Sequence, residues 1–349
     1  MKSPGAELLA SSFLHDYKIY KKQFFKVFSI HRRGYNWNDW HVCGLTEENR
    51  KRFLSTAQYY AMHPLNEQRT YWIDDKLTIK YLCAGTPLDR LMPKYFYQID
   101  ASGTVLALPD APAFDAASRS CSVIVDLLEA VGELALKRVV GSLGEGFYKA
   151  EYRDGRYYLN GEAHSRDTLE KKLGTLRDYL ITEYLHPHKD MVPFSADTVN
   201  TLRYLVGRTD SGMILLKSYI RFGTKASGFV ENYGAGGVLC YVSGDGTFSC
   251  GNILDFGTMR NTVIRAHPDT GIDLKGQIPL WKDIEKAADD FCRYFPQLDY
   301  LGLDFVITDK NEVKILEINS LTSLDGFQMD GPIFDRPEGE FCRKRLRTM

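Results

Sequence analysis

The stretch YLGLDFVITDKNEVKILEINS, residues 300–320, decides the fold. Two apolar runs flank a polar turn, a pattern typical of a β-hairpin. If Lys310–Asn311 is a two-residue loop, antiparallel pairing places Asp304 directly opposite Glu317. Asn319 then lies on the same face, because side chains alternate along a strand. The sequence therefore predicts three oxygen-bearing side chains on one face of a largely apolar hairpin.

This oxygen cluster predicts a divalent metal site. Two facing carboxylates repel and raise each other's pKa unless a cation lies between them. A small set of oxygen ligands suits Mg²⁺ or Mn²⁺, which keeps water or phosphate oxygens in its other positions. The alternative is an exposed edge hairpin with solvated acids. The same register predicts two faces, with Val306, Val313 and Ile315 beside the acids and Leu303, Phe305, Ile307, Leu316 and Ile318 toward a core.

A second motif, LKRVVGSLGEGFYKA at residues 136–150, combines two strands with a glycine-rich loop. It lacks the lysine and hydroxyl residue that end a Walker loop, and a strand rather than a helix follows it. Such a loop lays backbone N–H groups over phosphates, and Lys137 adds a point charge. An ordinary glycine-rich turn is the alternative. The nearby metal hairpin favours nucleotide binding, with these candidate contacts: Gly141, Ser142, Gly144 and Gly146.

Length and composition bound the class of protein. A chain of 349 residues predicts two or three lobes, and a net charge of −1 gives no case for nucleic-acid binding. The seven cysteines are scattered without C-x-x-C spacing, which predicts reduced thiols and no zinc site. His15, Asp16 and Lys18 interrupt the first apolar run before a signal peptide could form. No window reaches the ~18 apolar residues of a membrane span, so we expect a cytoplasmic protein.

The order of elements predicts an α+β protein. Helices are expected over residues 6–31, 46–62, 72–84, 117–131, 165–177 and 281–294, with the TEEN sequence after Leu45 capping the second. A hairpin is expected across residues 101–103, and residues 110–117 are expected to be a linker. Residues 133–185 predict a compact α+β lobe, and strands dominate from residue 196 onward. The basic ending CRKRLR is expected to be a solvated tail.

This order of parts resembles the ATP-grasp superfamily of carboxylate–amine ligases. The segments SADTVNTLRYLVGR, YIRFG, FVENYGAGGVLCYV, AHPDTG and GLDFVITDKNEVKILEIN are similar to its sugar-transfer-associated, TupA-like branch. The resemblance covers about residues 70–330. It implies an ATP-grasp fold, in which two α+β lobes clasp ATP after a helical N-terminal region. The implied divisions are 1–70 (helical, a substrate-specificity element), 71–118 (N-terminal α/β segment), 119–185 (lid with the glycine loop) and 186–349 (core with the metal hairpin).

The resemblance also implies roles for particular residues. Asp304, Glu317 and Asn319 match the metal ligands. Lys137 matches the lid lysine that contacts ATP phosphates, and Lys76 matches an earlier lysine of this branch, which implies a nucleotide-binding residue. Arg203 and Arg221 would neutralise charge on the transferred phosphoryl group. The remaining nucleotide-binding positions are the adenine hinge at Glu183, Tyr184 and Leu185 and a segment near the triphosphate with Asn232, Gly236 and Gly237. Two departures stand out: Arg138 replaces a proline of the family, and Glu145 stands where a lysine is frequent.

The activity implied is an ATP-dependent ligation that forms an amide through an acyl phosphate, with Mg²⁺ or Mn²⁺ as cofactor. The partners implied are a small carboxylate and an amine from cell-surface polysaccharide synthesis, together with glycosyltransferase-pathway enzymes. Two alternatives stay open at this point. One is a phosphotransferase that stops after moving the γ-phosphate to a hydroxyl or carboxylate. The other is a nucleotide-binding partner of glycosyltransferases without turnover, which the intact Asp–Glu–Asn set disfavours.

Overall fold

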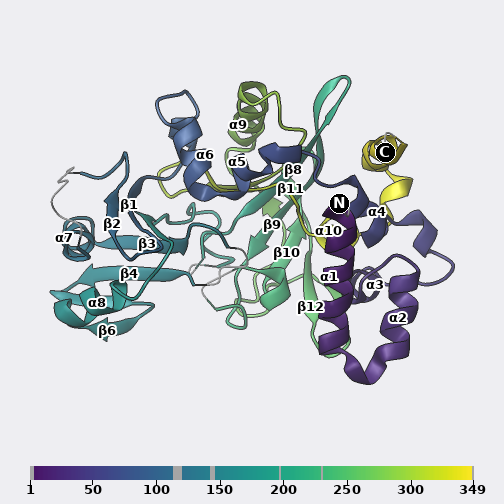
Figure 1. The fold of residues 1–349 in the computed structure, drawn as a ribbon, viewed down its shortest axis with the longest axis horizontal. Coiled ribbons are helices and arrows are strands. Elements are labelled where there is room, and N and C mark those ends of the chain that lie inside the picture. Colours follow the sequence, from purple (N-terminus) through teal and green to yellow (C-terminus); the bar gives the residue numbers. More distant parts are fainter. Residues whose placement is uncertain (1–3, 113–119, 142–145, 196–197, 229–230, 348–349) are drawn as a thin grey trace.

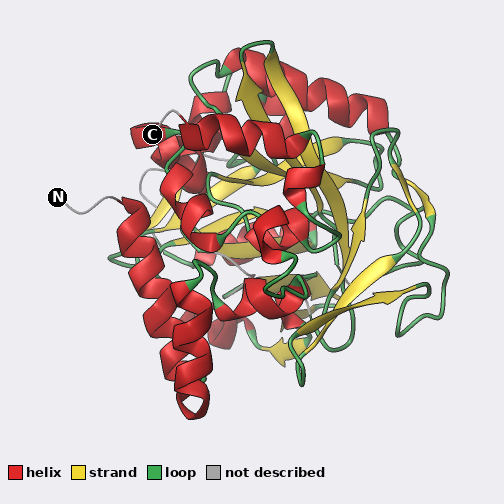
Figure 2. Ribbon diagram, turned by 90° about the vertical axis from the view of Figure 1, so that its right-hand side faces the viewer, coloured by secondary structure: helices red, strands yellow, loops and turns green. Residues whose placement is uncertain are grey.

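The computed structural model describes residues 4–112, 120–141, 146–195, 198–228 and 231–347. Its described part contains two seven-stranded antiparallel sheets with helices packed on them (Figure 1). One sheet lies at the left of Figure 1, the other crosses the centre, and the N-terminal helices stand at the right. Figure 2 shows these helices gathered on the side where the chain begins.

The first sheet has the strand order β2-β1-β7-β3-β4-β5-β6. Helices α7 (Ser122–Val131) and α8 (Arg166–Leu173) contact each other and the sheet. Their leucines, isoleucine and valine form the apolar core of this lobe with the inward side chains of the strands. The strands are β1 Tyr95–Ile99, β2 Val105–Ala107, β3 Glu133–Arg138, β4 Tyr148–Arg153, β5 Arg156–Leu159, β6 Glu162–His164 and β7 Tyr179–Glu183.

The second sheet has the strand order β13-β12-β10-β9-β8-β15-β16. Helix α9 (Trp281–Tyr294), α5 (Thr70–Asp74) and α6 (Lys76–Cys83) bury apolar side chains in the core on one face. The strands are β8 Leu202–Thr209, β9 Gly212–Phe222, β10 Val238–Tyr241, β12 Gly251–Asp255, β13 Arg260–Ile264, β15 Tyr300–Ile307 and β16 Val313–Asn319. A separate pair joins β11 (Thr247–Phe248) to β14 (Gly276–Gln277).

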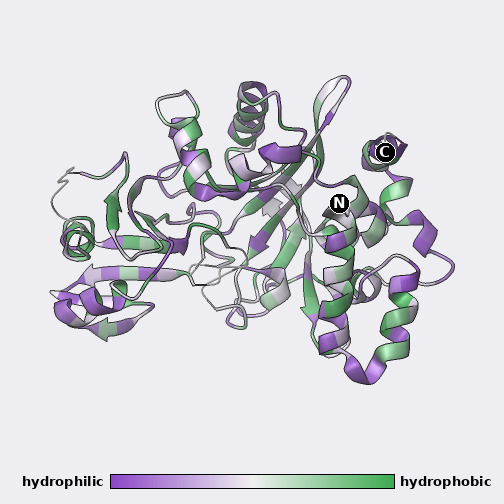
Figure 3. Cartoon of the chain, viewed as in Figure 1, coloured by the Kyte–Doolittle hydropathy of each residue, from purple (hydrophilic) through white to green (hydrophobic). Residues whose placement is uncertain are grey.

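The opposite face of the second sheet is covered by elements from both ends of the chain. Tyr59 of the N-terminal region and Phe327 and Phe341 near the C-terminus share one core with Leu205 of β8. Figure 3 shows that α1 and α2 carry both hydrophobic and hydrophilic stretches. The helices are α1 Pro4–Ile19, α2 Phe24–Arg32, α3 Trp37–Val42, α4 Thr56–Met62, α10 Leu324–Gln328 and α11 Glu338–Arg347. Short 3₁₀ helices lie at Lys21–Gln23, Arg50–Arg52, Glu67–Arg69, Asp89–Leu91, Tyr233–Ala235 and Ile333–Asp335.

The closing hairpin has the predicted pairing but a different loop. Asp304 lies opposite Glu317, as expected. The loop, however, is Asp309–Asn311 rather than two residues, with Asn311 in the left-handed region at φ 59°. A bulge at Leu316 shifts the register back by one residue before the acid pair. The longer loop shifts the pairing by one residue and the bulge shifts it back, so the two effects cancel at Asp304. The predicted acid pair is therefore confirmed, although the register between the loop and the bulge differs from the predicted one.

The bulge corrects the predicted faces of β16. Ile315 pairs with Phe305 and lies fully buried in the apolar core, as does Val313, so both were placed on the wrong face. Leu316 was expected in the core, but it lines the cavity described below. A β-bulge changes which side chains share a face, because two residues on one strand oppose a single residue on the other.

Helix boundaries in the N-terminal region differ from the predictions. The expected helix 6–31 is two helices that break near Tyr20. The TEEN sequence does not cap a helix; the cap of α4 is Ser55, whose side chain forms a capping box with Gln58. The expected helix 72–84 is likewise divided, and Asp75 caps α6 by accepting the N–H of Thr78.

Other expectations are confirmed or corrected in detail. Helix α9 has the predicted bounds, and the hairpin across residues 101–103 is present. The expected tail at residues 342–347 is part of α11, which buries Phe341 and Cys342. Most of the expected linker lies outside the described residues. The division at residues 70, 118 and 185 stays a prediction, although the first sheet takes strands from both sides of residue 118.

All seven cysteines are free thiols. Within the described residues, no helix is both long enough and apolar enough to cross a membrane.

Gly302 of β15 is expected to tolerate no side chain. A Cβ there would lie 2.4 Å from the Thr322 methyl group and 3.2 Å from a guanidinium nitrogen of Arg203. We predict that Gly302→Ala destabilises the fold by about 1–3 kcal/mol, as overpacking of a tight interior does. Urea denaturation measures this, with Gly244→Ala as control because a Cβ at Gly244 would meet nothing within 4 Å. Equal stability of the two variants would contradict the close packing at Gly302.

Candidate active site

A row of polar side chains crosses four adjacent strands of the second sheet. Tyr219 of β9 pairs with Arg203 of β8, Arg203 with Asp304 of β15, and Asp304 with Glu317 of β16. Directly opposed residues in an antiparallel sheet share a face. The strand register alone therefore places these side chains side by side on one surface.

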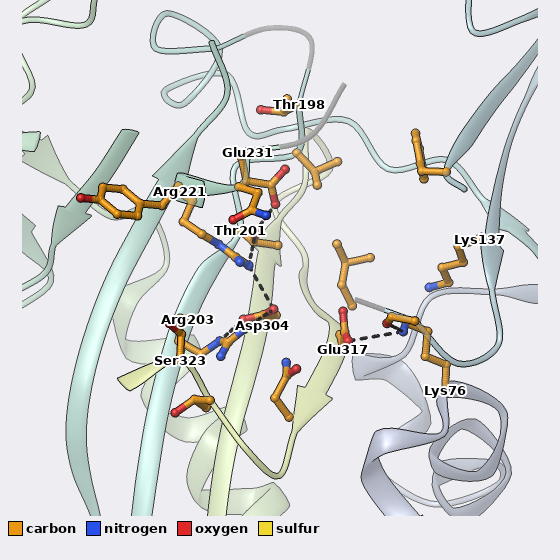
Figure 4. Close-up of a pocket in the computed structure, with 18 of the residues that line it drawn as sticks. Lys76, Lys137, Thr198, Thr201, Arg203, Arg221, Glu231, Asp304, Glu317 and Ser323 are labelled. Carbon is orange, nitrogen blue, oxygen red and sulfur yellow. Dashed lines mark hydrogen bonds and ion pairs between the residues drawn. The ribbon is translucent and has the colours of Figure 1, made fainter. Parts of the chain in front are cut away.

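Asp304 holds two arginines. The Nε of Arg203 donates to its Oδ1 and the Nη2 to its Oδ2 at 3.0 Å, and Arg221 Nη2 donates to the same Oδ2 at 3.0 Å (Figure 4). Arg221 also donates to the Thr201 hydroxyl at 2.8 Å, and this hydroxyl donates to Glu231. The five side chains form one network that fixes both guanidinium groups in place.

The network is ionised. Burial alone would raise the pKa of Asp304, but the guanidinium groups of Arg203 and Arg221 hold it below its usual range. Burial would lower the pKa of Arg203, and the negative charge of Asp304 raises it instead. Charge-assisted hydrogen bonds of this kind persist in a buried setting only where the partners match in geometry, as they do here.

A second ion pair faces this network across the site. Lys76, the first residue of α6, donates to Glu317 Oε1 at 3.3 Å and to the backbone oxygen of Gly141 at 3.0 Å. The preceding Asp74 accepts hydrogen bonds from the N–H and hydroxyl of Ser320, which ties α5 to the end of β16. Lys76 is thus held between Gly141 of the glycine loop and Glu317 of the closing hairpin.

Lys137 of β3 lies on the side of the first sheet. Its ammonium nitrogen stands 4.9 Å from the centre of the Tyr95 ring. Burial and the positive charge of Lys76 together lower the pKa of Lys137 to about 7, although Glu317 and Glu183 oppose the shift. The site therefore holds a lysine whose positive charge lacks a full counter-charge.

These side chains line one cavity of about 550 Å³ between the two sheets, which we call the main cavity. Its size is that of a site for a small molecule or cofactor. Of the predicted site residues, the following line it: Lys76, Lys137, Gly141, Glu183, Tyr184, Leu185, Arg203, Arg221, Asn232, Asp304, Glu317 and Asn319. The structure thus brings together the lysines, the arginines, the hinge and the hairpin.

Three predicted glycines do not line the main cavity. The N–H groups of Gly236 and Gly237 donate to the backbone oxygens of Tyr233 and Asn232. A Cβ at Gly237 would lie 2.6 Å from the Glu231 oxygen, so close backbone packing requires glycine there. Gly146 is close to the hydroxyl of Tyr179. Ser142 and Gly144 lie outside the described residues.

Sequence reasoning missed several residues at the site. Thr201 precedes Arg203 by two positions, so strand alternation places both on one face. This spacing could have predicted Thr201 as a site residue. Glu231 lies in an irregular segment, and Asp325 lies in the five-residue helix α10, which is too short to give a helical period. Burial raises the pKa of Asp325, although a hydrogen bond from Asn38 opposes the shift. Long-range packing alone brings these two carboxylates to the cavity.

The donor set of the hairpin fits a divalent metal that keeps other ligands. Glu317 and Asn319 line the main cavity, and the amide nitrogen of Asn319 is buried without a hydrogen-bond partner among the described residues. In the same part of the chain, no group of three His, Cys, Asp or Glu side chains could hold a metal alone. A metal at this hairpin would need an amide, water or phosphate oxygen beside the two carboxylates, as Mg²⁺ accepts.

Comparison with known families gives one match. A model of the family described as sugar-transfer associated ATP-grasp matches residues 56–336. No curated protein matches the sequence.

Several solved structures are similar to the chain at low identity. The ATP-grasp ligase PsnB, complexed with a minimal precursor, Mg and ADP, is 13% identical with a TM-score of 0.40, over 81% of this chain and 61% of that one. D-alanyl-alanine synthetase A from Vibrio cholerae is 11% identical with a TM-score of 0.44, over 79% and 65%. N5-carboxyaminoimidazole synthetase from Staphylococcus aureus, complexed with ADP, is 10% identical with a TM-score of 0.40, over 73% and 46%. The chain spans less than two thirds of the length of each.

Loss of the buried Asp304 carboxylate should destabilise the fold more than loss of the half-buried Glu317 carboxylate. Asp304→Asn removes the counter-charge of two buried arginines, so we predict a loss of about 3–5 kcal/mol in the free energy of unfolding. Glu317→Gln removes the partner of Lys76 where the Glu317 side chain is 29% exposed, and we predict a loss of about 1 kcal/mol or less. Denaturant titration of both variants measures this. Similar losses in the two would contradict the structural role of the Asp304 network.

Lys137→Met is predicted to raise the melting temperature. In the folded state Lys137 loses its proton near pH 7, whereas in the unfolded chain it keeps it up to about pH 10.4. The charged lysine therefore destabilises the fold most below pH 7, and the gain from Lys137→Met should shrink between pH 7 and 10. Thermal melts at pH 6.5, 8 and 9.5 measure it.

The matched control for Lys137→Met is Lys149→Met on the neighbouring strand β4. Lys149 pairs with Glu133 and Glu151, which raise its pKa although burial opposes them. Loss of these pairs should give no gain in melting temperature. A gain for both variants would show that any lysine-to-methionine change stabilises this sheet.

Proposed function

Because the chain belongs to the sugar-transfer-associated ATP-grasp family, we propose that it is an ATP-dependent carboxylate–amine ligase. ATP phosphorylates a carboxylate, which gives an acyl phosphate and ADP. The amine then attacks the acyl phosphate, which gives the amide and phosphate. The family is described as sugar-transfer associated, which supports a substrate from a sugar-transfer pathway. The proposed substrates are an amino acid and a sugar or peptide precursor of a surface polysaccharide. Enzymes of that glycosyltransferase pathway are the expected partners.

The observation that carries the proposal is the convergence of cationic side chains from both sheets on the main cavity. Lys137 comes from the first sheet, Arg203 and Arg221 from the second, and Lys76 from α6 between them (Figure 4). Fixed positive groups around one space suit a reaction in which a phosphoryl group moves between two oxygen atoms.

The charges around the main cavity also favour a metal-bound nucleotide. Among the described lining residues, five are cationic and five carry carboxylates: Lys76, Lys137, Arg138, Arg203 and Arg221, and Glu183, Glu231, Asp304, Glu317 and Asp325. A bare triphosphate would add several negative charges to a balanced site. Divalent cations bound to its oxygens remove that imbalance.

Each group has a proposed task. Lys76 and Lys137 bind the phosphates, and the N–H of Gly141 begins the loop over them. The Glu183 N–H already donates to Lys94, so the adenine hydrogen bonds fall to the backbone at Leu185, beyond the end of β7. From the glycine-containing segment after Glu231, Asn232 is the proposed contact, because it lines the main cavity and Gly236 and Gly237 do not.

Arg203 and Arg221 are the proposed catalytic residues. Both arginines line the main cavity, Arg203 from β8 and Arg221 from β9. Hydrogen bonds to Asp304 hold their guanidinium groups in place. They would orient the carboxylate oxygen toward the γ-phosphorus and stabilise the charge on the transferred group. Asp304, Glu317 and Asn319 would hold Mg²⁺, with Mn²⁺ as a substitute, which neutralises phosphate charge when bound.

The second half-reaction follows from the first. The lone pair of the amine nitrogen forms a bond to the acyl carbon while the carbon–oxygen bond to phosphate breaks, and the nitrogen loses protons as phosphate leaves. No covalent bond to the protein is needed. The described residues around the main cavity include no cysteine, and their roles are to bind, orient and exclude water.

ADP release separates a ligase from a phosphotransferase. We expect ADP from a library of carboxylates and amines only when both are present, or when hydroxylamine replaces the amine and traps the acyl phosphate as a hydroxamate. ADP with a carboxylate or sugar alone, without hydroxamate, would show a phosphotransferase. No ADP and no ATP binding by the intact protein would exclude both.

Glu317→Gln tests the metal ligands. We expect it to reduce turnover at least 1,000-fold, about 4 kcal/mol of transition-state stabilisation, with a melting temperature close to that of the parent. Titration with Mg²⁺ at fixed ATP should show weaker metal dependence than in the parent. Full activity at ordinary Mg²⁺ would exclude Glu317 as a ligand.

A further inference from the structure

A second, smaller cavity of about 230 Å³ adjoins the main cavity. We call it the second cavity. Its lining comes from three parts of the chain: Asn36, Asn38 and Asp39 at α3, Thr56, Tyr59 and Tyr60 of α4, and residues 321–324. Residues 321–323 also line the main cavity, so the two spaces share this wall. The N-terminal helices thereby reach the site where we place the chemistry.

Asp39 lines the second cavity with an oxygen that has no partner. The residue is 3% exposed, and its Oδ2 accepts a hydrogen bond from the Thr56 hydroxyl. Among the described residues, no donor reaches its Oδ1 and no cation forms an ion pair with it. Buried carboxylates are ordinarily paired with a cation or fully hydrogen-bonded. A carboxylate oxygen that faces a cavity without a partner suits a ligand that donates hydrogen bonds.

A second carboxylate, Asp325, lines the main cavity two residues beyond the shared wall. Asp325 accepts from the Asn38 side chain at 2.9 Å, from the Gly326 N–H at 2.7 Å and from the Ser323 hydroxyl. All three donors are neutral, and no described cation pairs with Asp325. Burial, together with the negative charge of Asp325, raises the pKa of Asp39 to about 7. Two carboxylates thus face the junction of the cavities without a positive partner.

We propose that the second cavity binds the amine substrate as an ammonium ion beside Asp39, with Asp325 at the adjoining edge of the main cavity. Before its nitrogen attacks the acyl carbon, the ammonium ion passes one proton to the Asp39 carboxylate. This inference rests on the ligase function proposed above and adds the substrate class of its amine side. An ammonium group donates in several directions, which suits one open carboxylate oxygen and a second carboxylate nearby. The rings of Tyr59 and Tyr60 add surfaces that attract cations.

The same features argue against a divalent metal in the second cavity. Mg²⁺ sites in proteins ordinarily rest on one or two carboxylates together with phosphate oxygens, and the second cavity offers a single carboxylate, Asp39, beside neutral amides and hydroxyls. The small volume admits the head group of an amine, and the wall at residues 321–323 leads toward the site of the acyl carbon.

Small amines test the proposal without knowledge of the natural substrate. Methylammonium, ethanolammonium, glycinamide and putrescine are titrated onto the full chain, and binding is followed by saturation-transfer NMR at pH 7.5. At least one should bind saturably to the parent, and Asp39→Asn should weaken it 10-fold or more. Asp335→Asn, which alters an exposed acid paired with Arg52, should bind as the parent does. No saturable amine binding, equal binding by Asp39→Asn, or displacement of the amine by Mg²⁺ alone would overturn the proposal.

The melting temperature distinguishes binding from a structural role of Asp39. An asparagine can still accept from Thr56, and it removes a buried charge without a counter-ion, so Asp39→Asn should melt higher at pH 8. Asp39 ionises above about pH 4 in the unfolded chain but only near pH 7 in the folded protein. Its destabilising effect therefore grows between these two values, and the gain from Asp39→Asn should vanish toward pH 4. The titratable groups facing it are all acidic: Asp16, Tyr35, Cys43, Tyr60 and Asp325. A lower melting temperature at pH 8 would show a structural carboxylate and overturn the proposal.

The same samples separate this inference from the ligase function. Asp39→Asn should bind Mg–ATP with the affinity of the parent, because the residue lines only the second cavity. Failure of the parent to bind Mg–ATP would refute the ligase proposal whatever the amine result. Amine binding lost together with Mg–ATP binding in Asp39→Asn would overturn the separate amine subsite.

Discussion

The carboxylate of Asp304 is the fixed point of this site, because two arginines from two different strands depend on it. Arg203 and Arg221 are both removed from bulk water, and each would be costly without a counter-charge. Their shared partner holds both at one depth on one face of the sheet. Thr201 and Glu231 extend the network, so the guanidinium groups have few alternative positions. A site arranged in this way needs little rearrangement when charge develops on a bound phosphoryl group.

Other charged groups around the two cavities lack the full counter-charge that Arg203 and Arg221 have. Lys137 is a cation without a full counter-charge, and Asp39 and Asp325 are carboxylates without a cation. Both arrangements oppose stability in the free protein, which is common where a binding partner supplies the missing charge. The two kinds of unbalanced group lie at different ends of the joined cavities. The structure thus separates a region suited to an anion from a region suited to a cation, with the compensated Asp304 network between them.

Much of this could be read from the sequence, and the reasons for the exceptions are physical. The acid pair at Asp304 and Glu317 followed from strand alternation, but the bulge at Leu316 did not, because a single extra residue leaves no periodic signal. The glycine loop and Lys137 were recognisable from residue type and order. Asp325 and Asp39 were not, since only packing between segments far apart in the chain brings them to the cavities. The helices of the N-terminal region were expected, whereas their contact with the site through Asn38 and Asp325 could not be.

The hydrogen bond between Asn38 and Asp325 joins positions 287 residues apart and crosses a boundary of the family match, which begins at residue 56. Residues 36–39 precede that boundary, yet they form one wall of the second cavity. Under the proposed function, a change in this leading segment would alter the cavity proposed for the amine, whereas the lining of the main cavity comes from residue 76 onward. Relatives with the same core and unrelated leading helices would then be expected to differ in what they join rather than in how they activate it.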